Sequence, residues 1–150
     1  MHRLLASWFG TGLVLGRVTG RDVGSGTVAS VVTFPLAVWL GSAWGWQAQL
    51  ATAVGVVILG WLVVRSLPGE GDAGWIVIDE AAGTMFAVIG LTTGPALVAL
   101  AVFRLADIYK RFFPGVKAAE RLNGPTGIMA DDLVAAVYGI AAGYIFDALI

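Results

Sequence analysis

The sequence contains no cysteine and a single histidine, His2, and these scarcities exclude several kinds of catalytic chemistry. Without cysteine the chain forms no disulfide, no thiolate metal site and no cysteine nucleophile. Because the one histidine stands at the extreme N-terminus, the rest of the chain offers no histidine nucleophile. The charged side chains left for a metal site or a phosphate site are therefore carboxylates, lysines and arginines.

Charged residues are also scarce. Only 13% of the 150 residues are charged, 58% are hydrophobic, and the mean hydropathy is +0.85, whereas soluble domains are about 25% charged. This is the composition of a membrane protein, with a length that fits one domain over residues 1–150. The net charge of −1, with nine Lys and Arg residues, argues against a nucleic-acid partner, which would need clustered positive charge.

Two uncharged apolar segments, residues 28–40 and 48–64, are joined by the sequence GSAWGWQ, whose tryptophans suit a membrane interface. This pattern predicts a helical hairpin in the membrane. The N-terminal stretch lacks the features of a cleaved signal peptide, so we expect it to be retained. The turn of this hairpin has no basic residue, whereas its open ends are flanked by Arg3, Arg17, Arg21 and Arg65. This distribution predicts that both ends are cytoplasmic.

After a polar loop at residues 66–74, two further apolar segments, 81–91 and 95–106, are separated by TTGP, and each is too short to span a bilayer alone. Either residues 81–103 form one crossing broken at Gly94 and Pro95, or they form a re-entrant or interfacial hairpin. We favour the hairpin, because it brings the charged residues at both ends together. Residues 132–149 are predicted to form a last membrane-spanning helix. The predicted fold is therefore all-α, that of a small helical integral membrane protein.

Five acids flank these apolar segments: Asp79, Glu80, Asp107, Asp131 and Asp132. Carboxylates in the absence of His and Cys are the hard oxygen ligands that Mg²⁺ prefers. Neighbouring residues on a helix are about 100° apart, so we expect only one member of each adjacent pair to point inward.

Positive side chains accompany the acids. Arg104, Asp107 and Arg111 are spaced to share one helical face, with Lys110 beside them, and this face is either a solvated ion-pair stripe or a phosphate-binding surface. The stretch VGSGTVAS, residues 23–30, leads into the first apolar helix. Its exposed N–H groups either are capped locally by Ser25 or Thr27 or bind an anion. Cysteine and histidine nucleophiles are excluded. Residue type does not exclude an aspartyl-phosphate route, but its DxDxT motif is absent from the sequence. What remains is metal-assisted attack by water on the phosphate.

The blocks GTG (10–12), SGTVAS (25–30), WIVIDEAAG (75–83), FRLADIYK (103–110) and GPTGIMADDLVAA (124–136) resemble, in this order, the phosphatidylglycerophosphatase A family of bacterial membrane enzymes. The resemblance implies an all-helical fold, dependence on Mg²⁺ and an active site at the five acids. From the residues and the resemblance together we predict metal ligands at Glu80, Asp107, Asp131 and Asp132, a further catalytic acid at Asp79, and substrate contacts at Thr11, Ser25, Thr27, Arg104, Lys110 and Arg111.

The predicted function is Mg²⁺-dependent hydrolysis of the phosphate monoester of phosphatidylglycerophosphate in the bacterial cytoplasmic membrane, at a site that faces the cytoplasm. Ser25 and Ala29 stand where the family usually has proline and glycine, so a different phosphorylated lipid stays open as the substrate. The alternative function is a non-enzymatic membrane carrier or assembly protein whose acids bind a cation.

Overall fold

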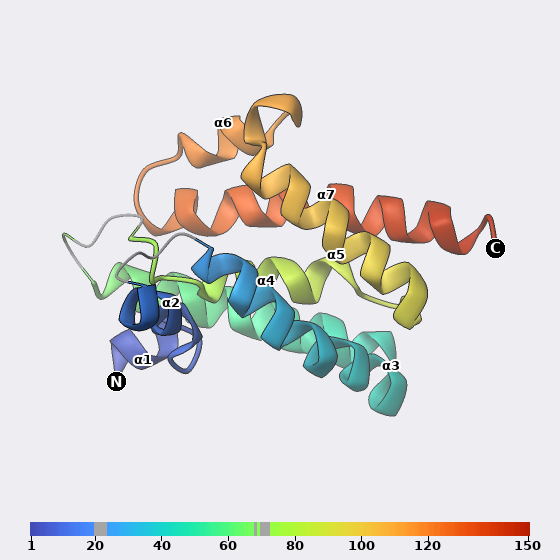
Figure 1. Ribbon diagram of the computed structural model, residues 1–150, viewed down its shortest axis with the longest axis horizontal. Coiled ribbons are helices and arrows are strands. Elements are labelled where there is room, and N and C mark those ends of the chain that lie inside the picture. Colours follow the sequence, from blue (N-terminus) through green and yellow to red (C-terminus); the bar gives the residue numbers. More distant parts are fainter. Residues whose placement is uncertain (20–23, 68, 70–72) are drawn as a thin grey trace.

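Helices form the regular structure of this chain. The computed structural model describes residues 1–19, 24–67, 69 and 73–150, and within these residues it contains helices and no strand (Figure 1). The elements are α1 (His2–Ala6), α2 (Thr11–Thr19), α3 (Ser25–Arg65), α4 (Ile78–Ala87), α5 (Thr93–Ile108), the 3₁₀ turn η1 (Lys110–Phe112), α6 (Val116–Glu120) and α7 (Pro125–Asp147). The predicted all-α fold is confirmed. Arg21, Val23 of the predicted anion-binding stretch, and positions 68 and 70–72 of the predicted polar loop lie outside the described residues.

Helix α3 is a hairpin of two antiparallel arms. Gly45, at φ 82° and ψ 171°, leaves the helical conformation between them. The Gln49 side-chain nitrogen donates a hydrogen bond of 2.8 Å to the Ala37 carbonyl, 12 residues earlier, whereas a straight helix would separate these residues by about 18 Å. The predicted first hairpin is therefore confirmed. Its arms are longer than predicted, roughly 20 residues and ~30 Å each, which matches the thickness of a bilayer's hydrocarbon core.

Helices α4 and α5 form a second hairpin. The chain turns between them at Gly90, whose φ of 72° favours glycine, and it then runs back toward the end of the molecule where α4 begins (Figure 1). The Gly90 N–H donates a 2.8 Å hydrogen bond to the Gln49 side chain, so one residue joins the tips of both hairpins. The predicted hairpin over residues 81–103 is confirmed, and the single broken crossing is excluded.

Helix α7 packs closely against α5 because small residues line its inner face. A Cβ on Gly139 would lie 2.6 Å from the Ala99 carbonyl oxygen, and a Cβ on Gly143 would lie 2.4 Å from the Leu91 side chain. Small residues allow this approach between membrane helices. In the part of the chain that the structure describes, α3 and α7 are the two helices long and apolar enough to cross a membrane, with hydropathies of 1.8 and 1.5.

Two predicted helix boundaries were wrong. Helix α7 begins at Pro125 and not at residue 132, because proline fits the first turn of a helix, where its missing N–H costs nothing. Asp131 and Asp132 thus lie near the end of the second turn of α7, about 9 Å along the helix axis from Pro125, and not at the start of the helix. Helix α5 ends at Ile108, so the tighter turn at Lys110–Phe112 removes Arg111 from the face that it was predicted to share with Arg104.

Candidate active site

The five predicted acids meet where α4, α5 and α7 come together. Asp79, Glu80 and Asp132 each offer a carboxylate oxygen within 4.8 Å of the others, and Asp107, Asp131 and Asp132 do the same. Because Asp132 belongs to both groups, the five residues form one continuous acid cluster. Four of them are buried, with exposures between 3% for Asp132 and 9% for Asp107.

Asp131 and Asp132 are both buried, which corrects the prediction that only one acid of a pair points inward. The side chains of Asp131 and Asp132 leave the helix about 100° apart. Because α7 packs against α4 and α5 and also against α6, other helices cover both side chains. Asp132 lies among the acids of α4 and α5. Asp131 lies against Lys110 and accepts a 3.0 Å hydrogen bond from the Asp132 N–H, so it also braces its neighbour.

Lys110 is held by three carboxylates. Its ammonium nitrogen lies 2.5 Å from Asp131 Oδ2, 3.2 Å from Glu120 Oε1 and 3.9 Å from Asp107 Oδ1. Burial by itself lowers the pKa of Lys110, but the hydrogen bond to Asp131, with the charges of Asp131 and Asp107 and the bond to Glu120, outweighs burial and raises this pKa above its ordinary value. Lys110 is thus a fixed positive charge that links α7 to the end of α5.

Arg104 joins the acid cluster to the start of α3. Its guanidinium forms an ion pair of 2.7 Å with Asp107 and donates a 3.5 Å hydrogen bond to the Thr27 hydroxyl. Ser25, two residues before Thr27, is 1% exposed. The SGT stretch therefore lies against the charged residues that were predicted to form a site, and Arg104 is not part of a solvated ion-pair stripe.

Gly26 allows this approach. A Cβ at this position would lie 1.9 Å from Glu80 Oε1 and 3.0 Å from a guanidinium nitrogen of Arg104. Only glycine leaves room for the Glu80 carboxylate beside the first turn of α3. No sequence pattern pointed to Gly26, because its importance comes from a contact between helices far apart in the sequence.

Two predicted substrate residues make their observed contacts outside the acid cluster. The Thr11 hydroxyl donates to the carbonyls of Ser7 and Trp8, at 3.1 and 3.0 Å, and so stabilises the local turn before α2. Arg111 is exposed, with its guanidinium 4.5 Å from the centre of the Phe112 ring. Conversely, Glu120 pairs with Lys110 but lies outside all the sequence blocks, so no sequence signal pointed to it.

The buried carboxylates fit a divalent cation. Glu80 Oε2 and Asp132 Oδ2 are buried and have no hydrogen-bond partner among the described residues. A buried carboxylate oxygen without a partner is costly, and a cation that accepts oxygen ligands would remove that cost. The donor set, composed of carboxylates alone, matches the preference of Mg²⁺ over softer metals.

Fold and site together define a helical membrane protein with a buried carboxylate centre next to fixed arginine and lysine charges. The sequence profile of the phosphatidylglycerophosphatase A family matches residues 4–147. Phosphatidylglycerophosphatase A of Haemophilus influenzae is 34% identical over 143 residues, which cover 91% of this chain and 83% of that protein. The chain belongs to the phosphatidylglycerophosphatase A family, as the sequence blocks implied.

Family membership identifies the chain as an enzyme, a phosphatidylglycerophosphatase, and decides against the non-enzymatic carrier. No solved structure matches the chain significantly.

Proposed function

We propose that this protein hydrolyses the terminal phosphate monoester of phosphatidylglycerophosphate, giving phosphatidylglycerol, at a Mg²⁺-dependent site formed by α4, α5 and α7. The observation that supports it most is the convergence of five acids, from three separate sequence blocks, in one largely buried cluster. Glu80, Asp107, Asp131 and Asp132 would hold the metal. When bound, Mg²⁺ polarises a phosphoryl group and lowers the pKa of a coordinated water.

The protein's own cations have separate roles in this proposal. Arg104 lies between Asp107 and Thr27 and presents its guanidinium where a phosphate at the start of α3 would bind. The first turn of α3, around Gly26, favours an anion at the same place, because the N–H groups at a helix N-terminus point toward a negative charge there. Lys110 holds Asp131 and Asp107 in position and limits the repulsion between them.

The charge pattern also supports an orientation in the bacterial cytoplasmic membrane. The N-terminus, both ends of the α3 hairpin and the start of α4 lie at one end of the molecule (Figure 1). Arg3, Arg17 and Arg65 stand at that end, whereas the turn between the arms of α3 has no basic residue. By the positive-inside rule, we propose a multi-pass topology in which this end and the acid cluster face the cytoplasm.

Phosphate release from the purified protein tests this function. We expect hydrolysis of phosphatidylglycerophosphate in detergent micelles with Mg²⁺, complete loss of activity in EDTA, and partial recovery with Mn²⁺, because Mn²⁺ accepts the same oxygen ligands. The assay is run on a panel of phospholipid monophosphates, including phosphatidic acid. Full hydrolysis in EDTA would rule out the metal-dependent mechanism, and release only from another lipid of the panel would change the substrate.

A further inference from the structure

A cavity lies next to the acid cluster, at the end of α5. It has a volume of about 430 Å³ and is lined by Ile108, Tyr109, Lys110, Arg111, Lys117 and Glu120. Lys110 is common to the cavity and the acid cluster, because its ammonium group pairs with Asp131. A group bound in this cavity would therefore be a close neighbour of a group bound at the acids.

The cavity carries an excess of positive charge. Its one acid, Glu120, pairs with Lys110 at 3.2 Å. Arg111 and Lys117 are exposed, and among the described residues neither forms an ion pair with a carboxylate. Two cationic side chains at an open cavity favour an anionic ligand, and a phosphate group suits both a guanidinium and an ammonium.

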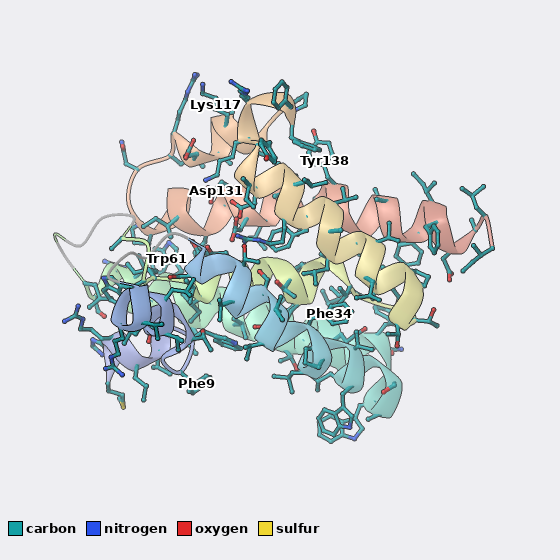
Figure 2. All side chains as sticks on the ribbon, in the orientation of Figure 1. Phe9, Phe34, Trp61, Lys117, Asp131 and Tyr138 are labelled. Atoms are coloured by element: carbon teal, nitrogen blue, oxygen red, sulfur yellow. The ribbon has the colours of Figure 1, made fainter. Side chains whose placement is uncertain are left out.

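Exposed apolar and aromatic side chains lie beside this charge: Ile108 and Tyr109 line the cavity, and Phe112 follows Arg111 in the chain. Ile108, Tyr109 and Phe112 are 57%, 50% and 65% exposed. Aromatic side chains with a polar tip, and basic side chains with long apolar stems, are typical of the level where lipid headgroups meet the hydrocarbon. Figure 2 shows Lys117 at the α6 edge of the molecule and Asp131 further toward its centre. The cavity is thus placed to bind the headgroup of a lipid whose acyl chains lie beside α5.

We propose that this cavity binds the phosphodiester of the lipid substrate while the terminal phosphate lies at the acid cluster. This inference rests on the proposed function. The substrate class is a phospholipid with two phosphate groups joined by a glycerol unit, the inner one bound by Arg111 and Lys117. Phosphatidic acid carries its single phosphate directly on diacylglycerol, so it would leave the cavity empty. The cavity would then be a specificity determinant for lipids with two phosphates.

Lys117→Gln tests the role of the cavity, because Lys117 is exposed and, in the part of the chain that the structure describes, forms no ion pair with a carboxylate. We expect its KM for phosphatidylglycerophosphate to rise about tenfold, the effect of losing one charge-assisted contact, with kcat changed less than twofold. Lys117→Arg should restore the KM. Arg17→Gln removes an exposed arginine from α2 and serves as the matched control, with KM unchanged.

Inhibition by phosphatidylglycerol gives a second measurement that does not require turnover of another lipid. Phosphatidylglycerol has the phosphodiester but no phosphate monoester, so its inhibition constant should rise about tenfold in Lys117→Gln, whereas diacylglycerol should inhibit both proteins equally. Unchanged KM and unchanged inhibition in both Lys117→Gln and Arg111→Gln would overturn the subsite while leaving the activity intact. Failure of the proposed function would appear differently, as no phosphate release by the unmodified protein.

Discussion

Asp132→Asn is expected to lower turnover of phosphatidylglycerophosphate by about 100-fold or more, the size of effect seen when a preorganised charged group is removed from an active site. Asp132 belongs to both groups of converging acids and is 3% exposed. Asparagine keeps its shape and removes its charge. Because four other acids surround it, the loss of one negative charge reduces repulsion, so the thermal unfolding temperature in detergent should stay the same or rise.

Asp147→Asn is the control for this change. Asp147 is the last residue of α7, is exposed, and lies about 22 Å along the helix from Asp132. The same substitution there should leave turnover within about twofold of the unmodified protein, since surface changes away from a site are usually small in effect. If Asp147→Asn abolished activity and Asp132→Asn did not, the acid cluster would not be the active site.

Gly26→Ala is expected to reduce turnover by a similar factor, about 100-fold. The added methyl group would lie 1.9 Å from Glu80 Oε1, so either the Glu80 carboxylate or the first turn of α3 must move. Both belong to the proposed site, and a displacement of about 1 Å in a catalytic group is enough for a loss of this size. Phosphate release at saturating lipid and Mg²⁺ measures the effect.

Gly55→Ala in the same helix separates this contact from a general effect of replacing glycine. No atom outside the helix backbone lies within 4 Å of a Cβ built at Gly55. Alanine there should preserve activity and slightly stabilise the helix, because it restricts the unfolded chain more than glycine does. Equal activity of Gly26→Ala and Gly55→Ala would show that the close approach of α3 to Glu80 has no catalytic importance.

The arrangement of helices was largely predictable from the sequence, because apolar length and charge position decide which segments cross and which return. The α4–α5 hairpin followed from two segments too short to span and from charges at both outer ends. The start of α7 was not predictable in the same way. The GP pair at 124–125 is compatible both with a loop and with the first turn of a helix, and only packing against α4, α5 and α6 selects the helix.

For the site, the sequence indicated the residues that carry charge but not all of their contacts. The five acids were identifiable, because a carboxylate beside an apolar segment is costly without a function. Arg111 was misplaced, since its position depended on α5 continuing beyond Ile108. Gly26 and Glu120 act through contacts with Glu80 and Lys110, and contacts between separate helices leave no periodic signal in the sequence.

Electron paramagnetic resonance of Mn²⁺ added to the purified protein without lipid tests whether the buried acids hold a divalent cation. We predict that the unmodified protein and Asp147→Asn bind Mn²⁺ with the same affinity, that added Mg²⁺ displaces it, and that Asp132→Asn loses this binding. Unchanged Mn²⁺ affinity in Asp132→Asn, or no binding by the unmodified protein, would contradict the assignment of the acid cluster as a metal centre.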